Sequence, residues 1–432
     1  MNNKKIIILG AGLAGLSAAW HLQNDATECL IFEKESDVGG LCRSRKIKDF
    51  IFDCDGHLLH FRNKYTLQLV NKLLKGNLVS HKRSAWINNF GIFSRYPFQA
   101  NLSALPEKIA KECLFEFLKA SQSRQTRAPV NFLKWINSSF GKGISRNFMV
   151  PYNRKFWTVP LDKMTSDWTD NFIPQPKPSE VIEGFFTENR QAFGYNSTFW
   201  YPRKAGIGQL PRAFEQRLGN VFKNCPVTEI DLDKKEITVC GRKKIKFDSL
   251  ISTIPLPELV KIIRPLPADI RGMFRKLRWN SIFNLNLGIK GDCQAGRHWI
   301  YFPHKESIFF RVGFFHNFSN NIVPRGSSAM YTEVAYSKNR PIDKSKVVSR
   351  IVKDLKACGV LAEDNKLSVL DINDIKYGYP IYDQDYSRVT AAIRGFLSRN
   401  KIIACGRYGN WQYMSMEDAI LDGRRAAGAI KR

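Results

Sequence analysis

Apolar and polar runs at the start of the chain predict a strand, a helix and a second strand. Residues 4–9 form an apolar run typical of a buried strand, residues 13–24 have helical character, and residues 29–32 form a second apolar run. The junction between the first strand and the helix carries the sequence Gly-x-Gly-x-x-Gly. The pattern therefore predicts a strand–helix–strand unit with a glycine-rich turn.

This turn has the composition of a dinucleotide-binding site. Gly10 permits the tight turn, Gly12 lets the backbone approach a pyrophosphate, and Gly15 lets the helix pack on the strand. The helix N-terminus then faces the anion. Glu33 ends the second strand, where a carboxylate meets ribose hydroxyls and favours NAD or FAD over NADP. A glycine-rich turn without a ligand would leave Glu33 unexplained.

Later runs predict inserted helices and a mostly antiparallel sheet. Residues 86–98 alternate around a glycine like a hairpin, and apolar positions recur at three and four between residues 102 and 156, as in helices. The prolines at 174, 176 and 178 predict a loop, and residues 229–248 a hairpin. Strand character returns in runs between 280 and 336, a helix is expected at 346–359, and residues 401–405 predict a last strand.

Composition is typical of a soluble enzyme of two or three domains. The chain has 432 residues, 44% of them hydrophobic, and no apolar stretch reaches the roughly 18 residues that span a bilayer. No secretory signal pattern opens the sequence. The nine cysteines are scattered without Cys-x-x-Cys pairs, so we expect free thiols, no metal site and a cytoplasmic location.

The charge balance is strongly basic. There are 67 basic and 39 acidic residues, giving a net charge of +28, which attracts polyanions. The densest lysine cluster, in residues 234–246, alternates with apolar positions, as on the solvent face of a strand. We interpret it as a solvated face, with peripheral contact with an anionic membrane as the alternative. No nucleic-acid-reading motif accompanies it, so no nucleic-acid partner is expected.

Residues after Glu33 resemble the extended signature of FAD-binding oxidoreductases and amine oxidases. Asp37, the Gly39-Gly40 pair and the run from Cys42 to Ser44 follow in order. Near the other end, Gly406 and Arg407 follow a predicted strand and precede a helix that begins near Met416. A Gly-Arg pair there can bring a guanidinium to phosphate, the alternative being that Arg407 is an ordinary surface arginine. The resemblance implies FAD, held by Gly10, Gly12, Ala14, Gly15, Leu16, Glu33, Lys34, Gly40, Leu41, Cys42, His57, Gly406, Arg407 and Met416.

Further motifs narrow the resemblance to the UDP-galactopyranose mutases, within the amine oxidase and protoporphyrinogen oxidase superfamily. Residues 55–60 resemble that family's flavin-side histidine loop, and residues 152–157 match its Tyr-Asn-x-Lys-x-Trp motif. Residues 94–98, 206–210, 379–382 and 406–418 complete the series in the same order.

This resemblance implies an α/β fold with a Rossmann-like FAD-binding domain of the GR2 or amine-oxidase type, carrying an inserted helical segment and an inserted mostly antiparallel sheet. The expected divisions are 1–80 (first FAD-binding part), 81–100 (sheet hairpin), 101–200 (mainly helical substrate insertion), 201–257 (second FAD-binding part), 258–395 (antiparallel-sheet substrate domain) and 396–432 (third FAD-binding part).

The family's chemistry is an isomerisation without net redox change. The resemblance implies that N5 of reduced FAD attacks the anomeric carbon of a nucleotide sugar, displaces the nucleoside diphosphate, and lets the sugar reclose as a furanose. His57 would lie against the flavin, Tyr152 and Trp157 would flank the nucleotide, and Tyr379 would donate to the diphosphate. Each of the four could instead be an ordinary core residue.

The family's two diphosphate-gripping arginines match less well. Arg190 could be one of them, and at the position of the other the chain has Asn280, with Arg278 close by. Three functions therefore stay open. The leading one is a flavin-dependent sugar-nucleotide mutase in surface-glycan biosynthesis, the second is an FAD oxidoreductase of the amine oxidase or protoporphyrinogen oxidase type, and the third is a flavin-bound protein without catalysis.

Overall fold

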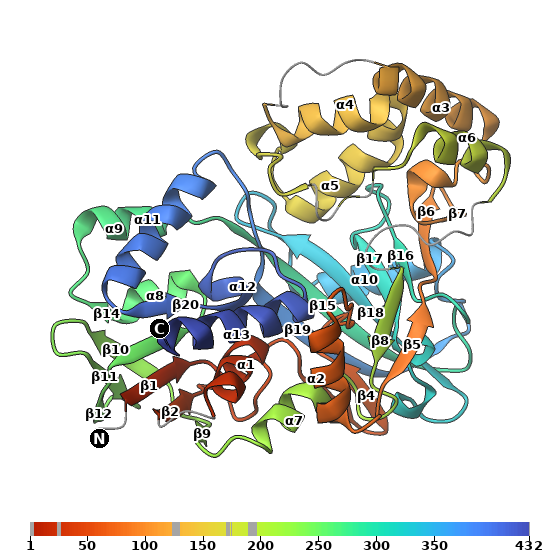
Figure 1. Cartoon of the computed structure of the whole chain (residues 1–432). Coiled ribbons are helices and arrows are strands. Elements are labelled where there is room, and N and C mark those ends of the chain that lie inside the picture. Colours follow the sequence, from red (N-terminus) through yellow and green to blue (C-terminus); the bar gives the residue numbers. More distant parts are fainter. Residues whose placement is uncertain are drawn as a thin grey trace.

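Both ends of the chain enter one parallel sheet (Figure 1). The computed structural model describes residues 4–23, 27–122, 130–169, 173, 175–188 and 197–431. The sheet has the order β20-β13-β1-β2-β9, and every neighbouring pair is parallel. Its strands are β1 (Lys4–Leu9), β2 (Thr27–Phe32), β9 (Val221–Phe222), β13 (Ser249–Ser252) and β20 (Ile402–Ala404). The strands expected at the start and the end of the chain are thus confirmed as β1, β2 and β20.

Two helices from opposite ends of the sequence cross on this sheet. Helix α1 (Leu13–Leu22) follows β1, and helix α13 (Met416–Lys431) closes the described chain. A Cβ added at Gly423 would stand 2.5 Å from the Ala14 carbonyl oxygen, so the helix backbones approach closely. The Ser17 hydroxyl also donates to the Ile420 carbonyl at 2.7 Å. The first and last helices therefore hold the nucleotide-binding fold together.

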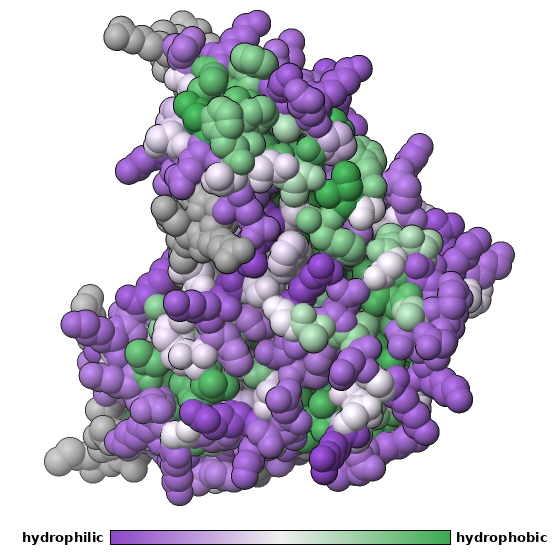
Figure 2. Space-filling view, turned by 90° about the vertical axis from the view of Figure 1, so that its right-hand side faces the viewer, coloured by the Kyte–Doolittle hydropathy of each residue, from purple (hydrophilic) through white to green (hydrophobic). Residues whose placement is uncertain are grey.

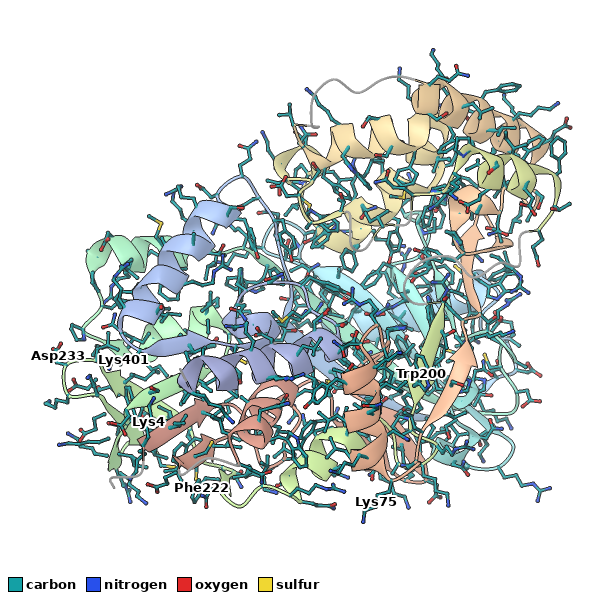
Figure 3. All side chains as sticks on the ribbon, viewed as in Figure 1. Lys4, Lys75, Trp200, Phe222, Asp233 and Lys401 are labelled. Carbon is teal, nitrogen blue, oxygen red and sulfur yellow. The ribbon has the colours of Figure 1, made fainter. Side chains whose placement is uncertain are left out.

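A small basic sheet flanks the parallel sheet. It has the order β12-β11-β10-β14, built from β10 (Val227–Asp231), β11 (Glu236–Val239), β12 (Lys243–Lys246) and β14 (Ile263–Arg264). Ile237, Val239 and Phe247 are buried, while the lysines of the cluster are exposed, as the alternation predicts. Figure 3 places Asp233, in the β10–β11 turn, at the same end of the molecule as Lys4 and Lys401, well away from Trp200.

A seven-stranded sheet forms the centre of the molecule (Figure 1). Its order is β19-β15-β18-β17-β16-β6-β7, and all its pairs are antiparallel except β16 with β6. The strands are β6 (Ala85–Asn89), β7 (Ile92–Arg95), β15 (Trp279–Lys290), β16 (Trp299–Tyr301), β17 (Arg311–Phe314), β18 (Ser327–Tyr336) and β19 (Lys366–Pro380). The predicted hairpin around Gly91 is confirmed as β6 and β7.

A helical segment covers one end of this sheet (Figure 1). It contains α3 (Glu107–Gln122), α4 (Phe132–Ile144), α5 (Val150–Trp157) and α6 (Pro178–Phe186). The expectation of a loop through Pro178 is wrong, because Pro178 begins α6, where its missing amide hydrogen has no helical partner to lose. Figure 2 shows hydrophobic residues gathering on the upper part of the molecule. Phe115 of α3 and Phe186 of α6 are exposed apolar side chains of this segment.

The segment between the two nucleotide-binding ends also contains helices that the sequence patterns did not predict. They are α8 (Leu256–Ile262), α9 (Ala268–Lys276) and α11 (Tyr386–Arg399), beside the expected α10 (Val347–Ala357). Three further elements border the flavin-side loop and the glycine turn: β4 (Phe50–Asp53), α2 (Lys64–Leu74) and α7 (Gln209–Glu215). In the described residues no helix is long and apolar enough to cross a membrane.

Candidate functional site

The glycine turn has the geometry of a phosphate cradle. Gly10 has φ of +94°, and a Cβ added at Gly15 would stand 2.1 Å from the Gly10 carbonyl oxygen. A Cβ at Gly12 would meet nothing within 4 Å, so space opens in front of the N-terminus of α1. Gly12 also pairs with Gly39, whose amide donates to the Ala11 carbonyl at 2.8 Å. The second glycine pair therefore lies beside the first, as the FAD signature requires.

Glu33 directly follows β2, and its carboxylate accepts hydrogen bonds from two backbone amides. Its carboxylate accepts the Ala11 amide at 2.7 Å and the Glu35 amide at 3.0 Å, and the residue is buried. The carboxylate thus reaches the glycine turn where a ribose is expected. Lys34 instead has a side chain that is 73% exposed and paired with Glu35, and the structure does not bring it to the turn.

The C-terminal segment meets the glycine turn. Gly406 has φ of +76° and begins the short helix α12 (Gly406–Gly409), and a Cβ there would stand 2.7 Å from the Ala14 methyl carbon. Its amide donates to Asp422 at 2.6 Å. Four expected cofactor residues, Ala14, Leu16, Cys42 and Met416, share one buried core. Leu41 packs instead against a separate apolar cluster that contains Ile282 and Ile375 of the central sheet. The two chain ends therefore converge on one site.

Arg407 extends from α12 into an aromatic cluster. Its guanidinium carbon lies 4.6 Å from the ring centres of Tyr379 and Tyr413, and these two rings are stacked with centres 5.9 Å apart. Its Nε and Nη2 atoms are buried and have no hydrogen-bond partner among the described residues. Buried donors of this kind fit an anionic or carbonyl acceptor on a ligand, as a flavin dinucleotide or a diphosphate provides.

Helix α5 brings two of the expected substrate residues to the same cluster. The Tyr152 ring stacks on Phe156, Phe156 lies 4.6 Å from Tyr379, and Trp157 lies 6.3 Å from Tyr379 between ring centres. The Trp157 indole nitrogen is buried without a partner among the described residues. Lys155 anchors the helix, because its ammonium donates to the Phe302 and His304 carbonyls and to the Ser307 hydroxyl.

His57 follows β4 and lies close enough to Arg407 for the two side chains to interact electrostatically. Its backbone amide donates to the Asp55 carbonyl at 2.9 Å, and its Nδ1 lies 3.2 Å from the same oxygen. Burial, and then the positive charge of Arg407, lower the pKa of His57 to about 4. The imidazole is therefore neutral near pH 7 and can donate from one nitrogen and accept at the other.

The arginines singled out from the sequence are placed differently. Arg190 lies outside the described residues. The Arg278 guanidinium donates to the neighbouring carbonyls of Arg275 and Leu277. Asn280 is fully buried, with its Nδ2 donating to the Phe156 carbonyl at 2.7 Å and its Oδ1 accepting the Tyr379 amide at 2.8 Å. Asn280 thus joins α5 to β19 instead of presenting a charge.

Another arginine, not expected from the sequence, belongs to the site. Arg311 on β17 forms a two-pronged ion pair with the buried Glu333 on β18, and its Nη2 lies 2.8 Å from Oε1 of Glu333. Tyr301 and Tyr331 were likewise not expected from the sequence. Tyr301 contacts the Tyr152 ring, and Tyr331 packs between Gly56 and Gly313. In the described residues no group of His, Cys, Asp and Glu side chains could hold a metal ion.

Comparisons with known proteins agree with this geometry. A crystal structure of reduced UDP-galactopyranose mutase superposes with a TM-score of 0.95 at 28% identity, covering 100% of this chain and 94% of the other. A putative protoporphyrinogen oxidase from an Exiguobacterium species superposes with a TM-score of 0.78 at 15% identity, covering 100% and 99% of the two chains.

Sequence similarity to curated relatives is partial. A UDP-galactopyranose mutase from Mycoplasma genitalium is 24% identical over 169 residues, which are 37% of this chain and 41% of that protein. The matched part therefore spans about two-fifths of that relative's length. The family model "Flavin containing amine oxidoreductase" matches residues 13–431. The expected fold class and the FAD cofactor are thus confirmed, and the chain is a UDP-galactopyranose mutase-like flavoprotein that belongs to the flavin containing amine oxidoreductase family.

Proposed function

We propose that the chain is an FAD-dependent sugar-nucleotide mutase that interconverts the pyranose and furanose forms of a nucleotide sugar. The observation that carries this proposal is the likeness to reduced UDP-galactopyranose mutase along the whole chain, with a TM-score of 0.95 at 28% identity. The aromatic cluster around Arg407 supports it, because a nucleotide sugar offers both a base for stacking and a diphosphate for a cation. A role in surface-glycan biosynthesis follows from the same proposal.

Each site residue has a defined part in this reaction. Arg407 and the Tyr379 hydroxyl bind the departing diphosphate, with Arg190 as a further cation, while Tyr152 and the Trp157 indole N–H hold the nucleotide and the sugar. The neutral His57 hydrogen-bonds at the flavin side of the site. The glycines of the two pairs, Glu33 and Gly406 hold FAD, which in its reduced form supplies the nucleophilic nitrogen. Fixing the sugar next to that nitrogen lowers the entropic cost of the attack.

Product analysis tests the proposal. The purified holoprotein, reduced with dithionite, is incubated with UDP-galactopyranose and with other nucleotide sugars, and the furanose product is separated by chromatography. We expect turnover with reduced flavin only and no net consumption of reductant. Tyr379→Phe is the matched variant, because it keeps the ring stacked on Arg407 and removes only the hydroxyl. Absence of furanose from every nucleotide sugar under reducing conditions would contradict the proposal.

A second candidate is an FAD oxidoreductase of the amine oxidase or protoporphyrinogen oxidase type. Two observations favour it: the amine oxidoreductase family model and the uncharged Asn280 at a position where the mutase resemblance calls for an arginine. An oxidoreductase would consume oxygen or a dye in the presence of an amine or a porphyrinogen. Oxygen uptake with such a substrate, without furanose formation, selects this candidate.

The basic sheet supports a separate, weaker proposal of contact with anionic lipid. Its exposed lysines have few acidic partners. In the segment from β10 to β12, Lys234 pairs with Asp231 and Lys244 pairs with Glu236. Sedimentation with phosphatidylglycerol vesicles and with phosphatidylcholine vesicles at several salt concentrations distinguishes membrane contact from a merely solvated face.

A further inference from the structure

A row of polar side chains crosses the central sheet beneath the His57 loop. Asn284 on β15 is directly opposite Asn373 on β19 and Glu333 on β18, and Glu333 is directly opposite Arg311 on β17. Directly paired residues point to the same face of a sheet, so the four side chains lie side by side. Asn284 and Glu333 are both 0% exposed. Polar groups at this depth are costly unless each has a partner.

Hydrogen bonds join this row to Asp55 of the His57 loop. Nδ2 of Asn373 donates to Oδ1 of Asn284 at 2.9 Å, and Nδ2 of Asn284 donates to Oδ1 of Asp55 at 3.2 Å. Both carboxylate oxygens of Glu333 accept hydrogen bonds from the Arg311 guanidinium. Asn284 therefore holds Asp55 beside Glu333, since it donates to the first and is directly opposite the second. Two buried carboxyl groups this close repel each other when both are ionised, so the arrangement favours a proton on one of them.

The charges around the pair favour keeping that proton. Burial, and then the neighbouring carboxylate against the pull of Arg311, raise the pKa of Glu333 to about 8, and burial likewise raises the pKa of Asp55. Arg311 balances the negative charge of one carboxylate. If both carboxyl groups were ionised, the second negative charge would be buried without a cation paired to it. The other titratable groups that interact with the pair are Cys54, His57, Tyr152, Tyr331, Tyr379, Arg407 and Tyr408. Among these, burial lowers the pKa of His57 and raises those of Tyr152, Tyr331 and Tyr379, which keeps those four groups neutral.

Asp55 in turn sets the course of the His57 loop. Its side chain accepts the Gly56 amide at 2.7 Å, while its carbonyl oxygen accepts the His57 amide at 2.9 Å. Gly56 has no freedom to move toward the sheet, because a Cβ there would already stand 2.1 Å from the Tyr331 hydroxyl. A shift of the Asp55 carboxyl is therefore passed to His57 and, through Glu333, to Arg311.

We propose that Asp55 and Glu333 share a single proton and act as a positioning pair, holding the His57 loop and the Arg311 guanidinium in place on the two sides of the flavin site. The pair acts through His57 and Arg311 and does not itself touch substrate. The inference goes beyond the proposed function, because it holds for a mutase and for an oxidoreductase alike, and its tests do not use turnover.

Infrared spectroscopy of the holoprotein tests for the proton directly. We expect a carbonyl band of a protonated carboxyl at pH 7.5 that disappears above about pH 9. Asp55→Asn keeps the shape of the side chain, cannot ionise and leaves the Arg311 ion pair intact, so Glu333 no longer faces a second carboxyl group and the band should be lost at pH 7.5. Glu333→Gln should lose it as well, since the remaining Asp55 then ionises beside Arg311. A band that persists in both variants, or a wild-type protein without one, would overturn the proposal.

Unfolding by urea between pH 6 and pH 8 gives an independent measure. The folded wild-type protein keeps one proton that the unfolded carboxyls have released, so its unfolding equilibrium constant should rise roughly tenfold per pH unit more steeply than that of Asp55→Asn. Parallel profiles would contradict a shared proton. If Asp55→Asn does not fold, the same comparison is made with Glu333→Gln.

The positioning role has its own readout. Asp55→Ala removes the acceptor of the Gly56 amide, whereas Asp55→Asn retains it, so we expect the FAD dissociation constant to increase at least tenfold in the alanine variant and to stay within about twofold in the asparagine variant. Equal FAD affinity in Asp55→Ala and wild type would contradict the positioning role while leaving the proposed function untouched.

Discussion

The guanidinium carbon of Arg407 lies 4.6 Å from the centre of the Tyr379 ring. Since Tyr413 flanks the same guanidinium at the same distance, two aromatic faces fix the cation in one orientation. A cation over an aromatic face gains about 0.5–2 kcal/mol, the larger value when it is desolvated. The Nε and Nη2 atoms of Arg407, buried and without a partner in the part of the chain that the structure describes, are thus held ready for a ligand acceptor.

Arg407→Lys should weaken the binding of an anionic nucleotide. Lysine keeps the positive charge but loses the planar set of donors and the stacking, so the dissociation constant of UDP, measured by titration calorimetry, should rise by about 10-fold to 100-fold, or about 1.4–2.8 kcal/mol. Arg278→Lys is the control, because Arg278 is bound to carbonyls outside the cluster and should leave UDP affinity unchanged. Equal losses in the two variants would mean that Arg407 has no special part in binding.

Alanine at Gly12 and at Gly15 should separate cofactor binding from folding. Gly15→Ala places a methyl group 2.1 Å from the Gly10 carbonyl oxygen and should destabilise the apoprotein by roughly 1–3 kcal/mol. Gly12→Ala meets no atom of the chain within 4 Å, so apoprotein stability should be nearly unchanged while FAD affinity falls. The measurements are urea unfolding without FAD and fluorescence titration with FAD. A Gly12→Ala protein that binds FAD normally would rule out this turn as the diphosphate site.

Asn280→Ala should destabilise the joint between α5 and β19. The variant leaves the Phe156 carbonyl and the Tyr379 amide without their partner, at a cost of roughly 2–4 kcal/mol in the free energy of unfolding. Asn280→Asp keeps the acceptor for the Tyr379 amide, but it loses the donor to Phe156 and buries a carboxylate beside that carbonyl oxygen, so at neutral pH it should destabilise the protein at least as much as Asn280→Ala. If both variants unfold at the wild-type urea concentration, the buried amide does not hold these elements together.

His298→Asn should make the protein less sensitive to acid. His298 is buried, its Nδ1 accepts the Ser84 amide at 2.9 Å, and burial lowers its pKa from 6.5 to about 4. The unfolded histidine therefore takes up a proton between pH 6.5 and pH 4 that the folded one refuses, and stability is lost as the pH falls through that range.

Asparagine keeps the acceptor and cannot be protonated, so the slope of the unfolding free energy against pH should be smaller by about 1.4 kcal/mol per pH unit. Urea unfolding at pH 4.5, 5.5 and 6.5 measures it. Identical slopes in wild type and variant would show that His298 titrates normally in the folded protein.

The sequence and the structure agree where function depends on local spacing. The glycine turn, Glu33 and the strand before Gly406 are all written within a few neighbouring residues, and each lies where the spacing predicts. Arg311 and Glu333 could not be paired in the same way, because strand register decides which residues face each other and a shift of one residue reverses the faces. The local hydrogen bonds of Arg278 likewise depend on the turn between α9 and β15, and no repeating pattern of apolar and polar residues predicts the shape of that turn.

The parallel sheet has a consequence for biosynthesis. Its central strand begins at Lys4, while its edge strand ends at Ala404 and the helix that crosses α1 continues to Lys431. During translation β1 can pair early with β2, but its other neighbour, β13, begins only at Ser249, and β20 pairs with β13 only after residue 402. Pairing across so long a sequence interval slows folding, and cofactor loading becomes a post-translational event.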